Sequence, residues 1–172
     1  MDRISVTPRP NYQEKIEQLG FDFHAAYWKE EAYYLLRADE VEKLEQATRQ
    51  AYQMMCEAAR HIIEERPQWM EQVLKIPPHV CRRIKYAWDE DEPSLYGRFD
   101  FLIAPDGTPK ILEFNADTPT SLLEASLIQW QWKEDLFSYR DQYNGIHEAL
   151  VQSWKDWNKA PCSAHFVGSL EN

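Results

Sequence analysis

The chain has 172 residues, of which 44% are hydrophobic, and this suits one compact domain with a buried core. Its 19 Lys and Arg against 29 Asp and Glu give a formal net charge of −10, so we expect no nucleic acid partner, because phosphate backbones need clustered basic residues. No apolar run approaches the roughly 20 residues of a membrane-spanning helix. The start of the chain shows no signal-peptide pattern, so we expect a cytoplasmic protein that does not enter a membrane.

The first part of the chain, residues 1–93, is predicted to be a mainly helical region. Apolar residues recur at steps of three and four over residues 39–66, which is typical of a long amphipathic helix that ends at Pro67. Two shorter helices are predicted at 67–76 and 80–88, on either side of a pair of prolines. The opening residues predict no defined element, although their many aromatic side chains indicate packing against a core.

Residues 94–160 differ in character, because strand patterns now precede helices. A strand is predicted over Leu95–Ile103 and a second over Lys110–Asn115, with a turn at Asp106-Gly107 between them. The elements predicted after this hairpin are a helix from Ser121, a helix near 145–157 and, within residues 161–172, another strand.

The hairpin sequence places polar side chains at alternate positions. Successive strand side chains point to opposite faces, so Arg98 and Asp100 share one face of the first strand. Glu113 and Asn115 likewise share one face of the second strand. A turn centred on Asp106-Gly107 would place Asp100 opposite Glu113. It would also place Arg98 opposite Asn115, so that the four polar side chains gather on one face.

The other face of this register is apolar. It pairs Phe99 with Phe114 and Phe101 with Leu112, which predicts a layer packed toward the core. A slip of one residue would instead set Phe101 against Glu113, which a buried face would reject. The hydrophobic pattern therefore favours the register that clusters the polar side chains.

The clustered residue types favour cation chemistry. Two carboxylates directly opposite on a sheet repel each other unless a cation lies between them. Asp, Glu and an Asn carbonyl are hard oxygen ligands that suit Mg²⁺, and Arg98 could neutralise charge on a transferring phosphoryl group. A structural salt bridge from Arg98 to Asp100 or Glu113 explains the same residues equally well. A third interpretation is a glycosidase-type carboxylate pair, because Asp100 and Glu113 would lie at about the carboxylate separation of retaining glycosidases. The neighbouring Arg98 and Asn115, however, suit phosphoryl chemistry better.

Several hydroxyl groups follow the hairpin. The segment Asp117-Thr118-Pro119-Thr120-Ser121 brings them to the start of the next helix. A helix amino terminus presents free backbone N–H groups that attract anions such as a substrate carboxylate. One hydroxyl is expected to cap the helix, and the presence of three together favours a binding role as well.

Two segments carry a resemblance to a known family: Tyr96-Gly97-Arg98-Phe99-Asp100-Phe101, and residues 112–125, LEFNADTPTSLLEA. They are similar to the glutathionylspermidine synthase family, and most of all to its single-function acid–amine ligases. The resemblance implies an α+β fold, with a helical amino-terminal region and a β-hairpin of an antiparallel ATP-grasp-like sheet. It also implies a ligase in which ATP phosphorylates a substrate carboxylate and an amine attacks the acyl phosphate, giving an amide, ADP and phosphate.

The resemblance also implies a role for each polar residue of the hairpin. Three of them match the family's magnesium ligands: Asp100, Glu113 and Asn115. Arg98 matches the catalytic arginine that stabilises the transferring phosphoryl group, and Arg98 and Asp100 together match positions at the ATP site. Thr118 and Thr120 match the family's glutathione-binding serines. Because threonines replace those serines, the resemblance implies a peptide-like acid substrate but does not identify it as glutathione.

Members of this family are longer than this chain. The part that grips ATP would follow residues 161–172, which would form the first strand of a truncated pre-ATP-grasp-like unit. We therefore expect this chain to be inactive alone and to expose an apolar surface that favours a homodimer. Mg²⁺ is the implied cofactor and ATP the co-substrate, with a small acid and an amine as partners. The alternative is a non-catalytic binding or regulatory domain that retains the fold.

Overall fold

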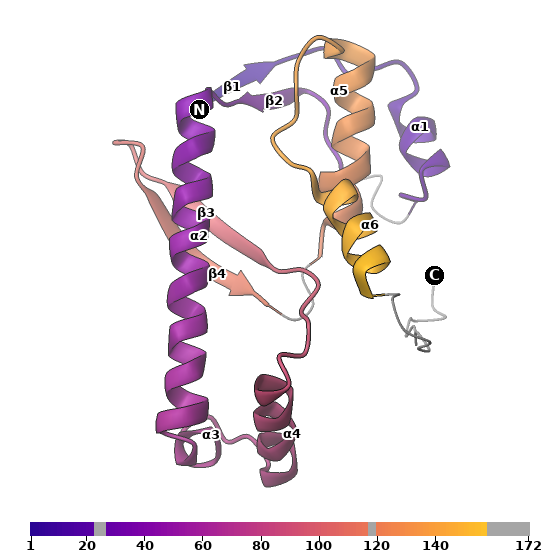
Figure 1. Ribbon diagram of the computed structural model, residues 1–172. Coiled ribbons are helices and arrows are strands. Elements are labelled where there is room, and N and C mark those ends of the chain that lie inside the picture. Colours follow the sequence, from indigo (N-terminus) through magenta and orange to yellow (C-terminus); the bar gives the residue numbers. More distant parts are fainter. Residues whose placement is uncertain (23–26, 117–119, 158–172) are drawn as a thin grey trace. The chain divides into compact units, whose positions relative to one another are not determined.

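The computed structural model describes residues 1–22, 27–116 and 120–157. Over these residues it is a mixed α+β structure of helices and two small antiparallel sheets (Figure 1), which confirms the predicted fold class. The chain divides into two compact units. One consists of residues 38–117, and the other combines the described parts of 1–37 and 118–172.

The unit of residues 38–117 begins with helices. α2 spans Ala38–Arg60 and continues into a turn of π-helix, η1, over His61–Glu65; α3 spans Gln68–Gln72 and α4 spans Pro78–Asp89. These bounds confirm the three helices predicted before residue 93. Pro78 lies in the first turn of α4, where a missing N–H removes no hydrogen bond because the first N–H groups of a helix have no intrahelical partner.

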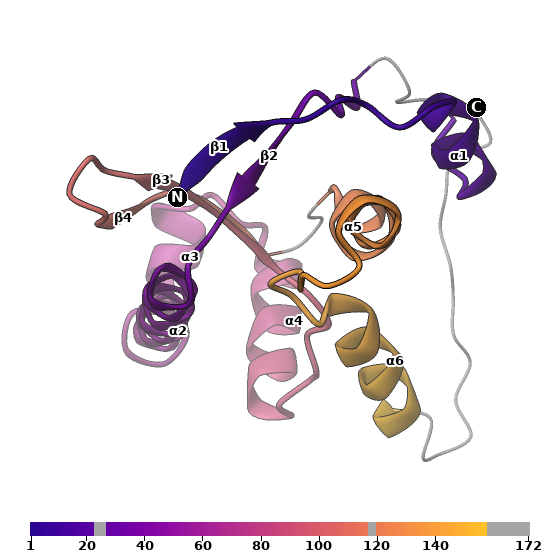
Figure 2. The same cartoon turned by 90° about the horizontal axis from the view of Figure 1, so that it is seen from above.

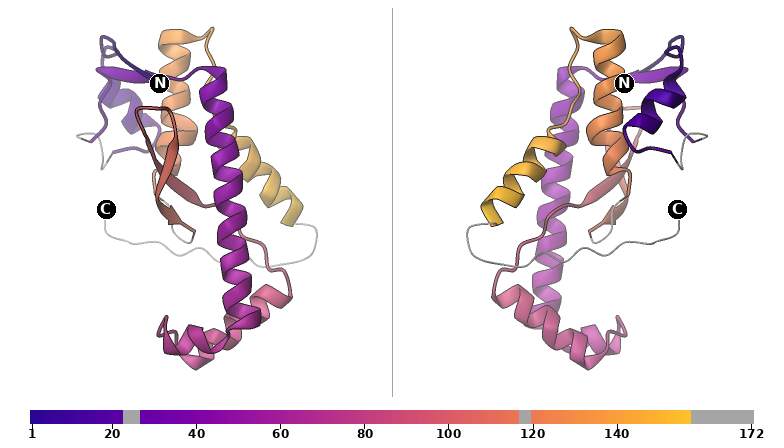
Figure 3. Two further views of the ribbon diagram at one scale, coloured as in Figure 1. Left: turned by 90° about the vertical axis from the view of Figure 1, so that its left-hand side faces the viewer. Right: turned by 90° about the vertical axis from the view of Figure 1, so that its right-hand side faces the viewer.

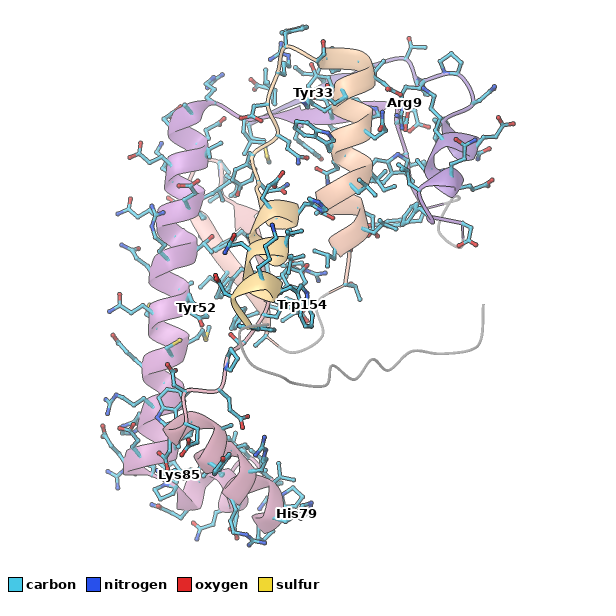
Figure 4. All side chains as sticks on the ribbon, turned by 45° about the vertical axis from the view of Figure 1, so that its right-hand side comes forward. Arg9, Tyr33, Tyr52, His79, Lys85 and Trp154 are labelled. Carbon is cyan, nitrogen blue, oxygen red and sulfur yellow. The ribbon has the colours of Figure 1, made fainter. Side chains whose placement is uncertain are left out.

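The core of this unit lies where η1, α3 and α4 meet. Ile63, Met70 and Cys81 are buried there, and partly buried side chains such as Trp88 pack around them. The indole N–H of Trp88 donates to Glu64 Oε1 at 2.8 Å, which ties α4 to η1. Figure 4 shows the side chains of this helical end, with His79 and Lys85 of α4 labelled.

The predicted hairpin is present in the same unit. β3 spans Arg98–Ile103 and pairs antiparallel with β4, Pro109–Asn115. The first strand does not begin at Leu95 as predicted, because its partner strand ends at Asn115, directly opposite Arg98. Within the described part of the chain, the residues before Arg98 therefore have no strand in this sheet to pair with.

The apolar face of the hairpin packs against α2 (Figure 3). The rings of Phe99 and Phe114 stack with their centroids 4.0 Å apart and 8° between their planes. Tyr52 of α2, labelled in Figure 4, meets Phe114 edge-on with 6.4 Å between the ring centroids. The Phe99–Phe114 part of the predicted apolar layer is confirmed, and α2 is the element that packs on it. Leu112 does not join this layer, because its side chain is exposed.

The turn of the hairpin has three residues instead of the predicted two. Gly107 N donates to Ala104 O at 2.8 Å, and Ala104 N donates to Thr108 O at 3.0 Å. Gly107 has a φ of 82°, a left-handed conformation that glycine adopts without steric cost. This is the three-residue loop in which a type I turn is followed by a left-handed residue.

The longer turn changes the pairing next to it. Phe101 pairs with Ile111, and not with Leu112 as predicted. The register then shifts by one residue between Phe101 and Asp100, because Leu112 is an extra residue in β4, a β-bulge. Beyond the bulge, Asp100 is opposite Glu113, as predicted.

The second unit contains elements from both ends of the described chain (Figure 2). Its elements are β1 (Asp2–Ser5), α1 (Tyr12–Gln18), β2 (Ala32–Leu35), the π-helical turn η2 (Glu124–Ile128), α5 (Gln129–Phe137) and α6 (Ile146–Trp157). β1 and β2 pair antiparallel, and the sequence did not predict them. Ile16, Phe21 and Ile128 form the buried core.

A buried ion network joins α5 to the amino-terminal segment of this unit. Arg9 and Glu30 are 3% and 1% exposed, and Arg9 Nη2 lies 2.6 Å from Glu30 Oε1. Arg9 Nη1 also contacts Asp135 Oδ2 of α5 at 2.9 Å, and Lys15 contacts the same oxygen at 2.7 Å. Trp28 Nε1 donates to Glu30 at 3.1 Å, so the buried carboxylate has several donors. Figure 4 labels Arg9 beside α5.

The aromatic side chains near the amino terminus pack only in part as predicted: Phe21 is buried and Tyr33 packs on other rings, whereas Tyr27 and Tyr34 are exposed. Tyr33 of β2, labelled in Figure 4, lies 5.3 Å from Trp132 and 5.1 Å from Phe137, measured between ring centroids. No helix among the described residues is long and apolar enough to cross a membrane. The strand predicted within residues 161–172 lies outside the described part of the chain.

Candidate functional site

The candidate site is the polar face of the β3–β4 hairpin. Arg98 and Asp100 come from β3, and Glu113 and Asn115 come from β4. Arg98 is opposite Asn115, and Asp100 is opposite Glu113, which confirms the register predicted for these pairs. The stacked phenylalanine rings hold the opposite face against α2, so the polar side chains point away from that helix.

The four side chains bond to one another. Arg98 donates from Nε to Asp100 Oδ1 at 2.8 Å and from Nη2 to Asp100 Oδ2 at 3.2 Å, a bidentate pair. The same Nη2 lies 3.7 Å from Glu113 Oε1. Asn115 Nδ2 donates to Glu113 Oε1 at 2.7 Å. One guanidinium therefore lies between the two opposed carboxylates.

The charges of this face are stabilised mainly by hydrogen bonding. The pKa of Asp100 is lowered from its usual value, first of all because Arg98 donates hydrogen bonds to the ionised carboxylate. The pKa of Arg98 is raised, with its hydrogen bonding to Asp100 as the largest cause. The side chains of Arg98 and Asp100 are 30% and 38% exposed, so both pKa shifts arise in contact with solvent.

Removal of the guanidinium is expected to raise the pKa of Asp100. A carboxyl group whose pKa is lowered by folding adds stability above its unfolded pKa, and this stability is lost as the pH falls through the lowered value. In Arg98→Ala the titration midpoint of the Asp100 carboxyl carbon, followed by NMR, should move upward from its wild-type position, because the hydrogen bonds that lower this pKa are lost. An unchanged midpoint would show that Arg98 does not stabilise the carboxylate in solution.

The donor set fits Mg²⁺. The face already surrounds one cationic group with carboxylates, and carboxylate and amide oxygens are hard ligands of the kind that Mg²⁺ takes. Among the described residues no cluster of three His, Cys, Asp or Glu side chains could hold a metal, so a metal here needs the amide oxygen of Asn115 as a third ligand. Three protein ligands leave positions for water and phosphate oxygens, as is usual for Mg²⁺.

Of the two threonines predicted to bind the substrate, the structure describes only Thr120. Thr118 lies outside the described residues. Thr120 is exposed and lies just before the helical segment that opens at Ser121, whose carbonyl accepts from Ala125 N at 3.1 Å. Thr120 belongs to the other unit, and Arg98 belongs to the unit of residues 38–117.

Gly97 is a contributing residue that sequence reasoning missed. A Cβ atom at this position would lie 2.9 Å from Phe114 Cε2, closer than two such carbons can approach. Glycine therefore lets the ring of Phe114 pack against the backbone just before Arg98. A glycine at the start of a strand pattern often marks such a close approach, and this signal could have identified it.

Comparison with known proteins identifies the class. The family model described as "Glutathionylspermidine synthase preATP-grasp" matches residues 3–172, and the chain belongs to this family. A protein of Haemophilus influenzae named "Putative acid--amine ligase" is 34% identical over 166 residues, which cover 90% of this chain and 41% of that protein. The trypanothione synthetase of Crithidia fasciculata is 30% identical over 101 residues, which cover 55% of this chain and 15% of that enzyme. The chain thus spans less than half the length of either relative.

Proposed function

We propose that the chain contributes the metal-binding and phosphoryl-transfer face of an ATP-dependent carboxylate–amine ligase. The observation that carries the proposal is the convergence of Arg98, Asp100, Glu113 and Asn115 on one face of the hairpin. Membership of the glutathionylspermidine synthase family and the names of both relatives support a ligase. The chain spans 41% of the Haemophilus protein, so turnover is assigned to the complete ligase and not to these residues alone.

The residues of the face have distinct proposed roles. Asp100, Glu113 and Asn115 hold Mg²⁺ through side-chain oxygens. The metal ion supplies charge neutralisation for the phosphate oxygens when it is bound. Arg98 donates two N–H groups to the phosphoryl group as it leaves ATP for the substrate carboxylate, where negative charge on the equatorial oxygens must be stabilised. The amine then attacks the acyl phosphate, which forms the amide bond and releases phosphate.

The substrates are proposed as classes. The acid is small and peptide-like, and Thr118 and Thr120 bind it. The position of Thr120 beside a helix start supports this, because the free N–H groups there complement a carboxylate. The amine is a small molecule whose identity the assay below would establish.

The test is ADP release by the full-length protein with Mg²⁺, over a panel of small peptides as acids and of polyamines and amino acids as amines. ADP should appear only when acid and amine are both present. Asp100→Asn should remove this activity, whereas Asp106→Asn should keep it, because Asp106 accepts a hydrogen bond from Thr108 N in the turn, away from the polar face. Equal loss in both variants, or release that needs no amine, would contradict the proposal.

One observation favours the alternative of a non-catalytic binding domain. Arg98 and Asp100 already form a complete bidentate pair without any ligand, as a structural salt bridge would. Binding of ATP that depends on Mg²⁺ and on Asp100 would separate the ligase from a domain that retains only the fold. The division at residues 93 and 160, the cytoplasmic location and the homodimer stay predictions.

A further inference from the structure

The polar face of the hairpin carries its own counter-ion. Both carboxylate oxygens of Asp100 accept hydrogen bonds from Arg98, one from Nε at 2.8 Å and the other from Nη2 at 3.2 Å. Nη2 also lies 3.7 Å from Glu113 Oε1, an oxygen that accepts a further bond from Asn115. The guanidinium therefore occupies the region between the carboxylates, where a metal ion held by both would have to lie.

Mg²⁺ cannot coordinate Asp100 directly while Arg98 keeps both of its hydrogen bonds to that carboxylate. Mg²⁺ binds its oxygen ligands at about 2.0–2.1 Å with near-octahedral geometry, so it needs a lone pair of Asp100 directed at the metal. A guanidinium that bonds both oxygens of the same carboxylate carries a positive charge at the same place. Mg²⁺ and Arg98 in its present position would repel each other and compete for the same oxygens.

We propose that Arg98 competes with the divalent cation for Asp100, so that metal binding displaces the guanidinium and releases it toward the phosphoryl group. This rests on the metal site of the proposed function. Without metal the single guanidinium offsets part of the charge of the two carboxylates, and Arg98 is held by Asp100. With metal bound, Asp100 is occupied and Arg98 becomes available to an anionic oxygen.

The surroundings of Arg98 allow such an exchange. Its side chain is 30% exposed, and those of its partners Asp100 and Glu113 are 38% and 57% exposed. The packed rings of Phe99 and Phe114 lie on the opposite face of the hairpin, so a new Arg98 rotamer leaves that apolar layer undisturbed. The exchange therefore needs no movement of the stacked rings.

The experiment measures Mg²⁺ binding to the full chain by calorimetry, without nucleotide, with Mn²⁺ binding followed by electron paramagnetic resonance as a second probe. Arg98→Ala should bind Mg²⁺ about fivefold more tightly than wild type, the effect of one partly exposed ion pair. Arg83→Ala is the matched control, because it removes the same charge from an exposed ion pair with Glu92. Its Mg²⁺ affinity should stay within about twofold of wild type.

Two further variants keep the result interpretable. Arg98→Lys retains the charge without the two-pronged geometry, so its affinity should lie between those of wild type and Arg98→Ala. Asp100→Asn should abolish binding. If Asp100→Asn abolishes binding but Arg98→Ala binds no more tightly than wild type, the competition is overturned and the metal site stands. If binding does not depend on Asp100, or no variant binds, the metal site of the proposed function fails and the competition fails with it.

Discussion

Under the proposed function, replacement of Arg98 by alanine is expected to lower kcat for ADP formation by the full-length protein about 10³-fold, the scale set by loss of a preorganised donor to a transferring phosphoryl group. The reason is geometric as well as electrostatic, since Nε and Nη2 already act as a two-pronged donor toward the oxygens of Asp100. Lysine at this position should recover only a small part of the rate, because an ammonium is a single point charge. Steady-state ADP release at saturating substrates gives the measurement.

The same variant separates rate from metal affinity. Because alanine no longer competes for Asp100, the Mg²⁺ concentration for half-maximal activity should fall even as kcat falls. A loss of folding would not produce these opposite changes. Arg83→Ala should keep kcat within about twofold of wild type, because its charge lies outside the polar face. An Arg98→Ala enzyme with wild-type kcat would reduce the Arg98–Asp100 pair to a structural salt bridge.

The largest effect on folding is expected at Arg9. Arg9→Leu would leave the Glu30 carboxylate, 1% exposed, without its ionic partner, and breaking a buried ion pair in this way costs about 3–5 kcal/mol of unfolding free energy. It also breaks the contact to Asp135 that joins α5 to the amino-terminal segment. Urea denaturation followed by circular dichroism measures the loss, and the transition of this unit should move to lower urea.

Lys15→Ala provides the comparison within the same network. Lys15 contacts the same Asp135 oxygen as Arg9, but its side chain is 43% exposed, so its loss should cost about 1 kcal/mol or less. Similar effects of the two variants would mean that burial of Glu30 does not determine the stability of this network. A loss below about 1 kcal/mol in Arg9→Leu would show the same, through movement of Glu30 into water.

Local patterns in the sequence predicted the elements that depend on local order. The long helix α2 could be predicted because its apolar residues recur at steps of three and four and a proline follows it. The pairing of Asp100 with Glu113 could be predicted because only one register keeps Phe99 and Phe114 off the polar face. The candidate site was predictable for the same reason, since its four residues lie within one hairpin.

Features that depend on distant residues could not be predicted in this way. β1 and β2 have four residues each and are separated by residues 6–31, so neither shows a pattern that names its partner. The Arg9 network joins residues far apart in the sequence, and because charged residues are seldom buried, no local pattern marks Arg9 as a core residue. The three-residue turn was missed because Asp-Gly suits a two-residue turn equally well, and the pairing of Phe101 was wrong as a result.

The β-bulge at Leu112 has a consequence for how freely the tip of this hairpin can vary. A two-residue turn at Asp106-Gly107 would pair Phe101 with Leu112 in an unbroken ladder, whereas the observed three-residue turn pairs Phe101 with Ile111 and leaves Leu112 over. Both arrangements keep Asp100 opposite Glu113. The bulge therefore confines a one-residue change of register to the tip of the hairpin, so that the pairs on the polar face keep their register. A one-residue change in turn length therefore leaves the pairing of Asp100 with Glu113 intact.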